Sequence, residues 1–559
     1  MMSTNQRITA QWILVLGTAW TSLIITPNYS LEPIDLPKMY ALVLTSFLAI
    51  GTIFTASKHI FLKKYYPILI LFILFLIQLA LVLKFSGAPF IQQFFGTGGR
   101  NTGALTYLSL FLVLIVAMLV TTPNFVTKVI ISLLLTGLAT LVYGLMQVSG
   151  IDPVSWNNPH SSMIGFLGNP DFSSAFLGIV GAGGFCLIFS GKLLSNLLGK
   201  SFLMLGEIIA LYLIVKSHAI QGIMIYFLGF LLSLGIYLYS QNGVRKSIVA
   251  IYGTLSSIAI TVGVLGALKI GPLADHLYKI SVRQRGFYWR AGREMLFSHP
   301  FFGVGMDSYG DWYYQKRSAN AAFHTIATSS NAAHNVFLDI GSNGGFPLLL
   351  IYLIVIVLVV KASFIILKNA SQRNPYISAV IVSWIAYQAQ SFVSINQIGL
   401  GVWGWLLGGV ILGYGINSRK IPDTDSSSKI GGRKPKKSSN SFILVGAIGL
   451  GVGFALVQPA LQADHNYRFA LQSRNGNQVI SAALSYPEDS HRTMDAANQL
   501  NSSNLKEPGL KLARHVVKVN PRSYEAWFFI SSLTDPTSKE HKLARDKLRM
   551  LNPHDNSIS

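Results

Sequence analysis

Charged residues are scarce in this chain of 559 residues. They make up 12% of it, against about one quarter in a typical soluble globular protein, while 51% of the residues are hydrophobic. This imbalance argues against a water-soluble enzyme. Cysteine is rarer still: Cys186 is the only one and lies inside an apolar run, which excludes intramolecular disulfides and a cysteine-based zinc site.

Acidic residues are also few. The chain has 22 Asp and Glu against 44 Lys and Arg, which gives a formal net charge of +22. In a soluble chain such an excess would suggest nucleic acid, but in a chain this apolar it first reflects membrane topology and contact with anionic lipid. We therefore expect membrane lipids, and no nucleic acid, among its partners.

Long apolar runs, by contrast, are abundant. A helix of about 20 residues crosses roughly 30 Å of hydrocarbon, and thirteen runs reach or approach that length. The sequence therefore predicts an all-α polytopic membrane protein with about thirteen transmembrane helices, at 8–27, 39–57, 66–83, 104–121, 126–147, 173–191, 202–216, 219–239, 247–270, 346–367, 376–395, 398–416 and 441–459. No small-residue cleavage pattern directly follows the first run, so we interpret it as a helix rather than a removed signal.

The distribution of Lys and Arg predicts the orientation, because cationic loops stay on the cytoplasmic side. With a cytoplasmic N-terminus, the loops and linker on that side would carry 17 Lys and Arg, and the short outer loops would carry four. An odd number of helices then places the C-terminal domain outside.

Three segments interrupt the membrane pattern. Within the predicted transmembrane domain, 1–416, residues 271–345 form a large extracytoplasmic loop. Residues 417–440, rich in Lys, Ser and Gly, are predicted to be a basic cytoplasmic linker that touches anionic lipid and precedes the last transmembrane helix, 441–459.

The tail, 461–559, is polar. Its turn-like prolines, Pro487, Pro521 and Pro553, recur at spacings of 34 and 32 residues. A period near 34 residues favours stacked helical hairpins of the tetratricopeptide (TPR) kind, which commonly bind a partner protein. A plain helical cap on the membrane domain is the alternative.

Cations gather in the predicted outer loop, although the short outer loops almost lack them. A helix predicted between Arg283 and Phe297 would place Arg285, Trp289 and Arg293 along one face. Arginine suits phosphate or diphosphate because its planar fork donates two hydrogen bonds and stays charged. A basic helix that faces lipid headgroups is the alternative.

His334 lies just before the next apolar segment, where a membrane-level site would meet the outer water. Histidine is the usual general base near neutral pH, and a structural histidine is the alternative. The outer loops contain no His-x-x-x-His pair and no Asp-x-Asp motif, so we expect no metal and no other cofactor. Cationic side chains would then have to neutralise a diphosphate leaving group.

Five ordered motifs between about residues 90 and 415 resemble the O-antigen ligase and polymerase superfamily. They are Gly96-Thr97-Gly98-Gly99-Arg100-Asn101-Thr102-Gly103, Gly165-Phe166-Leu167-Gly168-Asn169-Pro170-Asp171, Arg285-Gly286-Phe287-Tyr288-Trp289, His299-Pro300-Phe301-Phe302-Gly303-Val304-Gly305 and Ala333-His334-Asn335. The ordered set is far more specific than any single motif.

The resemblance implies a multi-helix membrane glycosyltransferase of the cytoplasmic (inner) membrane. Its donor would be a glycan on undecaprenyl diphosphate, and the reaction would face outward. His334 would activate the acceptor hydroxyl and Arg285 would hold the diphosphate, and in-line attack would invert the anomeric centre. Further residues carried by the resemblance are the donor contact Arg100 and the supporting residues Trp289, Asn335 and Asn169. Arg293, on the predicted helix face of Arg285, is a further candidate donor contact.

The chain departs from the family pattern at three places. Where ligases commonly carry a Ser-Arg-Gly step, this chain has Lys216-Ser217-His218-Ala219-Ile220-Gln221-Gly222, so Lys216 or His218 would have to supply the second cation. Asn343 stands where many members have glutamate. Asp171 stands where asparagine is usual, as a polar structural group or as a residue that orients the acceptor.

We therefore expect a ligase-type transfer of glycan to an acceptor lipid, polysaccharide or protein. A polysaccharide polymerase or protein O-oligosaccharyltransferase of the same superfamily is the alternative. An alternative of another class is a transporter of lipid-linked sugar. Glu207 is nearly alone as an acid inside the predicted helices, and no half repeat is visible, which argues against transport.

Overall fold

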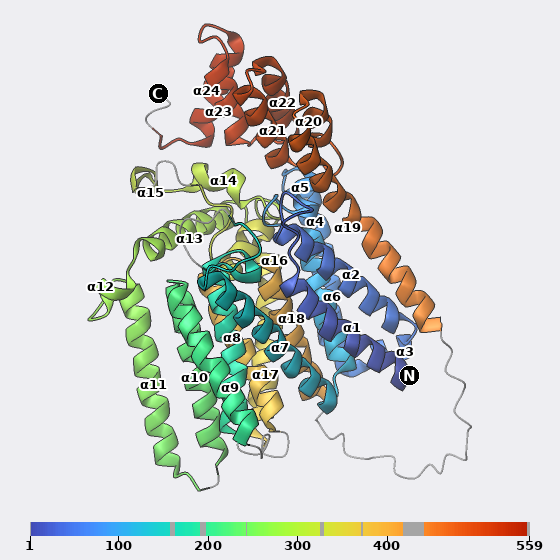
Figure 1. Cartoon of the computed structure of the whole chain (residues 1–559), viewed down its shortest axis with the longest axis vertical. Helices are drawn as coiled ribbons and strands as arrows, with labels where there is room; N and C mark the ends of the chain where they lie inside the picture. Colours follow the sequence, from blue (N-terminus) through green and yellow to red (C-terminus); the bar gives the residue numbers. More distant parts are fainter. Residues whose placement is uncertain are drawn as a thin grey trace.

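The computed structural model describes residues 2–156, 163–190, 197–241, 243–324, 329–369, 373–417 and 441–555, and the elements in these ranges are all helices. The predicted basic linker, 417–440, lies outside the described residues except for Asn417. The described chain forms a bundle of long apolar helices that shorter, more polar helices cover at one end (Figure 1).

Ten helices in the described ranges are long and apolar enough to cross a membrane, which makes the chain a multi-pass membrane protein. They are α2 (Asp35–Phe54), α4 (Tyr66–Phe85), α7 (Pro123–Val148), α8 (Pro170–Phe189), α9 (Leu197–Lys216), α10 (Ile220–Ser240), α11 (Lys246–Ala267), α16 (Val336–Lys368), α18 (Ile398–Asn417) and α19 (Ser441–Ser473).

The other three predicted runs fall on α1 (Thr4–Leu23), α6 (Ala104–Val120) and α17 (Pro375–Val393). Every predicted run therefore coincides with a helix, while the count of thirteen spans is not confirmed. Short turns join some of these helices: α3 (Ser57–Ile60), η1 (Lys63–Tyr65) and η2 (Gly165–Leu167).

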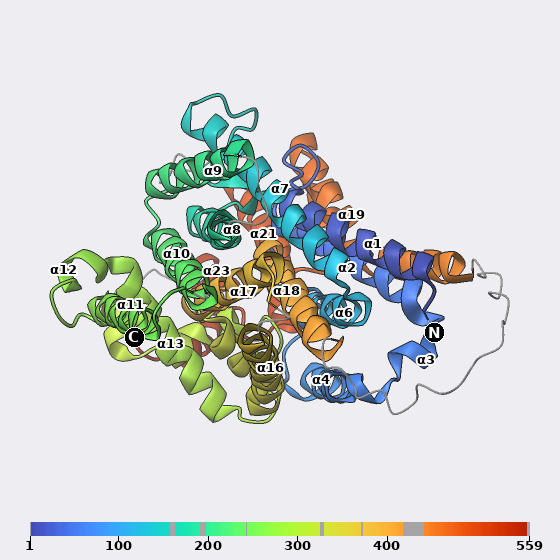
Figure 2. The same cartoon turned by 90° about the horizontal axis from the view of Figure 1, so that it is seen from below.

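The centre of the bundle is built around α18. In its most apolar stretch 94% of the residues are buried inside the protein, whereas none is buried in that of α11, which lies at the edge of the bundle (Figure 2). Glycines let α18 approach α6: a Cβ on Gly409 would lie 2.4 Å from the carbonyl oxygen of Leu114. Small residues of this kind allow the close helix packing that membrane interiors favour.

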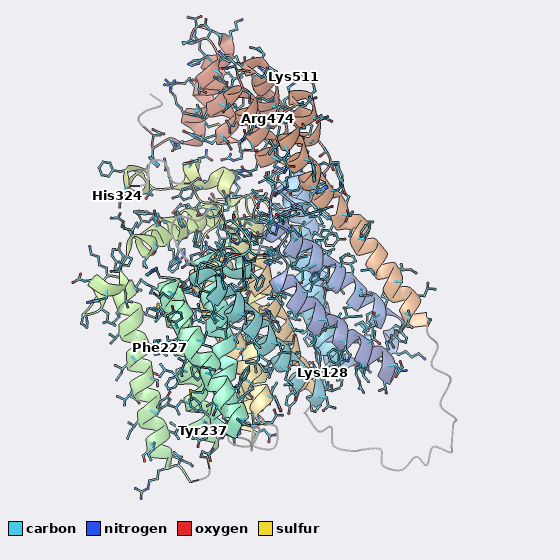
Figure 3. The ribbon with its side chains drawn as sticks, in the orientation of Figure 1. Lys128, Phe227, Tyr237, His324, Arg474 and Lys511 are labelled. Atoms are coloured by element: carbon cyan, nitrogen blue, oxygen red, sulfur yellow. The ribbon has the colours of Figure 1, made fainter. Side chains whose placement is uncertain are left out.

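The predicted loop 271–345 is largely helical. It contains α12 (Ala274–Leu277), α13 (Ile280–Ser298), α14 (Tyr309–Lys316) and α15 (Ala319–His324). The helix predicted over 283–297 is therefore confirmed as α13, which lies across one end of the bundle in Figure 1 together with the short α5 (Phe90–Phe95). In Figure 3, His324 projects outward from this end.

A sharp kink divides α16 at Gly345, whose φ of 76° is disfavoured for other residues. A Cβ there would lie 2.6 Å from the carbonyl oxygen of Phe301. The backbone N–H of Phe346 donates to the carbonyl oxygen of Pro300 at 2.7 Å, and that of Val304 donates to Ser342 at 2.8 Å. The kink thus fixes the turn after α13 against the first half of α16.

The tail continues directly from α19, which is one helix of 33 residues rather than a span that ends at 459. It contains α20 (Gly476–Ala483), α21 (Ser490–Ser502), α22 (Lys506–Val519), α23 (Tyr524–Leu533) and α24 (Lys539–Leu551). Pro487, Pro521 and Pro553 lie outside these helices, as expected for turn residues.

The tail helices share a core of their own, whose most buried members include Met494, Ala513 and Ile530. The helical character of the tail is confirmed, and its assignment to the TPR kind is not. The tail covers the end of the bundle that carries α13 and α14, while the N-terminus lies at the opposite end (Figure 1). Lys511 and Arg474 mark the tail in Figure 3.

Candidate active site

Arg285 on α13 connects three elements that are far apart in the sequence. Its Nη2 donates to Asp171 Oδ2 on α8 at 3.0 Å and to Gln221 Oε1 on α10 at 3.3 Å. The Arg285 side chain is 15% exposed and that of Asp171 is 38% exposed. The guanidinium therefore lies near the surface, within reach of an anionic ligand.

Asp171 is held by the start of its own helix. Asn169 caps α8, and its Oδ1 accepts a hydrogen bond from the backbone N–H of Asp171 at 2.8 Å. An acid in the first turn is favoured by the positive end of the helix dipole. Asn169 thus supports the site indirectly, by fixing the carboxylate that contacts Arg285.

Gln221 is a site residue that the sequence analysis missed. It is 3% exposed, and its Nε2 has no hydrogen-bond partner among the described residues. Its position directly before Gly222 was an available signal, because the family's arginine precedes glycine in the Ser-Arg-Gly step. An uncharged amide at that position replaces a cation with the two N–H donors of its Nε2.

His334 has an unusual backbone conformation, with φ of 52° in the left-handed region. Its ring stacks on that of Tyr288 with centroids 5.0 Å apart, and Trp289 Nε1 donates to its carbonyl oxygen at 3.2 Å. Strained backbone of this kind persists where surrounding contacts hold it, and such positions cluster at functional sites. The face of α13 that carries Trp289 thus also positions His334.

The environment of His334 keeps its ring neutral. Burial, followed by the charges of Arg285 and Arg100, lowers the pKa of His334 from 6.5 to about 3. At neutral pH the imidazole is therefore in its unprotonated form, which can accept a proton. The structure thus brings the predicted base within electrostatic reach of two of the predicted cations.

Arg100 is buried in an ion network close to His334. Its Nη2 lies 3.5 Å from Asp339 Oδ2 and its Nε lies 3.8 Å from Asp307 Oδ1. Asp339 Oδ1 also accepts from the backbone N–H of Ala333 at 3.1 Å. The guanidinium is thus engaged by two carboxylates, and the network fixes the loop that carries His334.

Arg293 is separated from Arg285 on α13. Each step of four residues turns an α-helix by about 40° relative to the previous one, so two steps carry Arg293 about 80° round the axis. Its side chain is 60% exposed and pairs with Glu294 at 3.4 Å. The buried stripe of α13, which includes Tyr288 and Met295, lies on the side of the helix opposite to Arg293.

The remaining predicted residues have other surroundings. Asn335 caps α16, with its Oδ1 accepting from the backbone N–H of Leu338 at 3.0 Å. Lys216 and His218 are exposed at the connection between α9 and α10. Among the contacts described, none joins Lys216, His218 or Arg293 to Arg285.

The described residues contain no group of three or more His, Cys, Asp or Glu that could hold a metal ion. The expectation of a reaction without metal stays a prediction. What the site does contain is a neutral imidazole, a partly exposed guanidinium and an amide donor at one end of the bundle. This set can take a proton from a hydroxyl and stabilise a nearby anion.

Comparison with known families identifies the segment that carries this site. Residues 163–353 match the family model described as O-antigen ligase, a range that includes Asp171, Gln221, Arg285, Trp289 and His334. No curated protein matches the chain. The matched range contains four of the five ordered motifs, and it supports the resemblance of this multi-pass membrane chain to the O-antigen ligase superfamily.

Proposed function

We propose that the chain transfers a glycan from undecaprenyl diphosphate to an acceptor hydroxyl, as a ligase-type glycosyltransferase. The observation that carries this proposal is that α13 holds both the ring of His334, through the stack on Tyr288, and the partly exposed guanidinium of Arg285, within an O-antigen ligase domain. A base and an anion-binding group are the two components that this transfer needs.

His334 acts as the general base. As the acceptor oxygen attacks the anomeric carbon, its proton passes to the imidazole, and the bond between that carbon and the diphosphate oxygen breaks. The leaving group is undecaprenyl diphosphate, and attack opposite to it inverts the anomeric centre. Tyr288 and Trp289 hold the imidazole in position through the ring stack and the hydrogen bond to its backbone.

Arg285 stabilises the negative charge that builds on the departing diphosphate. Asp171 pairs with its guanidinium and orients it. We expect the diphosphate to compete with Asp171 for Arg285 and to accept a further hydrogen bond from the free Nε2 of Gln221. These uncharged and charged donors together replace the missing arginine of the Ser-Arg-Gly step.

The other predicted cations contribute at longer range. Arg100 adds positive potential from its buried network, and electrostatic interactions are strong where water is excluded. Arg293 and Lys216 are exposed and attract the anionic donor as it approaches, and His218 is exposed two residues after Lys216. These roles depend on charge rather than on the fork geometry of arginine.

The proposal includes the predicted orientation, with the site and tail outside the cytoplasmic membrane and the N-terminus inside. The site lies at the tail end of the bundle, whereas Lys128, from a predicted inner loop, lies at the other end (Figure 3). Placement at one end also favours a transferase over a transporter, whose charged residues lie near the bilayer midplane.

The diphosphate role is tested by the variant Arg285→Lys. The purified chain in nanodiscs receives an undecaprenyl-diphosphate glycan and acceptor lipid, and the transferred glycan is measured by mass spectrometry. We expect transfer to fall at least tenfold, because lysine keeps the charge but loses the fork that binds diphosphate.

Arg290→Lys is the matched control, since Arg290 is an exposed arginine on the same helix. It should transfer at the wild-type rate. Equal activity in Arg285→Lys and Arg290→Lys would contradict the claim that Arg285 binds the diphosphate of the donor.

A further inference from the structure

Two cavities lie between the tail and the end of the membrane domain. The first has a volume of about 680 Å³ and is lined on one side by Phe90, Phe95 and Asn101, and on the other by the start of α21. The second, of about 320 Å³, shares Gln92, Thr97, Ser490, His491 and Glu525 with the first. We call the two together the tail cleft. Its volume is within the range of about 300–1,000 Å³ that small-molecule sites occupy.

The tail cleft ends close to His334. The second cavity is lined by Asp311 and Asn331. Asn331 precedes His334 by three residues, which limits their separation to about 11 Å. At the shared wall, the backbone N–H of Thr97 donates to Asp307 Oδ2 at 2.8 Å, within the ion network of Arg100.

The charge of the first cavity is opposite in sign to that of the chain, and the second cavity is lined by Asp311, Glu525 and Arg522. The first cavity is lined by six of the 22 acidic residues and by one of the 44 Lys and Arg residues. That one is Arg492, whose Nη2 donates to the carbonyl oxygens of Ser485 and Pro487. A diphosphate is therefore repelled here and attracted by Arg285, which separates the cleft from the donor site.

The lining also provides groups that match sugar hydroxyls and sugar faces. Asn101 is 6% exposed, and its Oδ1 has no hydrogen-bond partner among the described residues. The second cavity adds the rings of Tyr314, Tyr524 and Phe528. Flat aromatic faces with nearby carboxylate and amide acceptors suit a ring that is apolar on its face and hydroxylated at its edge.

The acidic residues that line the cleft belong both to the membrane domain and to the tail. Glu32, in the connection before α2, faces Asp464 and Asp489, and burial followed by these two charges raises its pKa. Carboxylates crowded in this way favour a ligand that donates hydrogen bonds or carries positive charge.

We propose that the tail cleft binds the acceptor as an oligosaccharide that lacks anionic groups, and that it presents a hydroxyl of this oligosaccharide to His334. The proposal rests on the proposed function, because it names the acceptor class of the same site. It also gives the tail a role in substrate binding, since α21 and α23 form one wall of the cleft.

The first test is direct binding to the full chain in nanodiscs, measured by calorimetry without donor. The probes are three hexasaccharides: neutral cellohexaose, cationic chitosan hexamer and anionic oligogalacturonate. We expect the first two to bind, and the anionic probe to bind at least tenfold more weakly. Tightest binding of oligogalacturonate would overturn the proposal, as would tighter, competing binding of a lysine-rich peptide of similar length.

The second test fills the region that the two cavities share. Ser490→Trp should weaken binding of the neutral and cationic probes at least tenfold, because Ser490 lines both cavities. Ser502→Trp, at the exposed other end of α21, is the matched control and should bind as wild type. Unchanged binding by Ser490→Trp would overturn the proposal.

A charge reversal covers the case in which Ser490→Trp does not fold. Glu525→Lys should weaken chitosan binding and strengthen oligogalacturonate binding, each at least threefold, since Glu525 lines both cavities. Glu507→Lys, whose side chain is 77% exposed on α22, is its control. Identical probe binding by Glu525→Lys and Glu507→Lys would contradict the claim that the probes bind in the tail cleft.

Donor binding separates this proposal from the proposed function. Ser490→Trp should bind the lipid-linked donor like wild type and lose transfer. If wild type binds the hexasaccharides through the cleft and never cleaves the donor, the proposed transferase function is wrong. The tail cleft would then still be an oligosaccharide site. If wild type cleaves the donor and Ser490→Trp transfers glycan at the wild-type rate, acceptor binding in the tail cleft is contradicted, whereas the proposed transferase function is not.

Discussion

At the scale of single residues, the site combines positions that the sequence marks and contacts that it does not. Arg285 and His334 stand in motifs, so their place in a candidate site could be predicted. Asp171 was noted as a departure, but its pairing with Arg285 joins residues 114 positions apart and had no local signal. Gln221 was missed because a neutral amide lacks the charge that drew attention to Lys216 and His218.

The lowered pKa of His334 predicts how stability depends on pH. Between pH 6.5 and about 3 the unfolded state binds a proton at this residue and the folded state does not, so acid favours unfolding. At pH 5 the resulting difference is about 2 kcal/mol.

Lowering the pH from 7 to 5 should therefore reduce the melting temperature of wild type more than that of His334→Asn. Asparagine is the chosen substitution because it tolerates the left-handed backbone better than most residues. The check is thermal unfolding of both proteins in nanodiscs at the two pH values. An equal loss in both would show that His334 titrates normally in the folded chain.

At the scale of elements, helix α13 was predicted well because its ends have local causes. Pro300 and two glycines stop the helix soon after Ser298, close to the predicted end at Phe297. The first half of α16 was outside the predicted apolar run, which began at 346. Its buried polar residues, including Asp339 and Asn343, are tolerated because they pack against the loops at the tail end of the bundle rather than lipid.

The kink at Gly345 provides a prediction at this scale. Gly345→Ala should destabilise the chain by about 1–3 kcal/mol, because its φ is left-handed and its Cβ would meet the backbone of Phe301. The melting temperature and the transfer rate should both fall. Gly253→Ala on α11 is the control, since a Cβ there meets nothing within 4 Å. Two variants of equal stability would contradict a structural role for the kink.

At the scale of the whole molecule, the tail is attached to the membrane domain by contacts that no local pattern could predict. The Arg522 guanidinium lies 3.3 Å from the ring centroid of Trp312, and the rings of Tyr314 and Tyr524 are 4.7 Å apart. Arg317 Nη2 donates to Asn552 Oδ1 at 3.1 Å. The apolar runs and the polar tail were predictable from composition, whereas this docking depends on pairs about 200 residues apart.

Arg522→Ala should loosen this docking, because it removes a cation–π contact of about 0.5–2 kcal/mol. We expect faster amide hydrogen exchange in α14 and α23, with exchange inside the membrane helices unchanged. Lys511→Ala, at an exposed position of α22, is the control (Figure 3). Unchanged exchange in α14 would show that Arg522 does not hold the tail in place.

A single-turnover transfer assay tests whether His334 takes the proton from the acceptor hydroxyl. Wild type and His334→Asn receive the same undecaprenyl-diphosphate glycan and acceptor, with excess chelator, and transferred glycan is followed over time. We expect a rate about 10²–10⁴-fold lower for His334→Asn, with donor binding unchanged. Transfer by His334→Asn at the wild-type rate would contradict it.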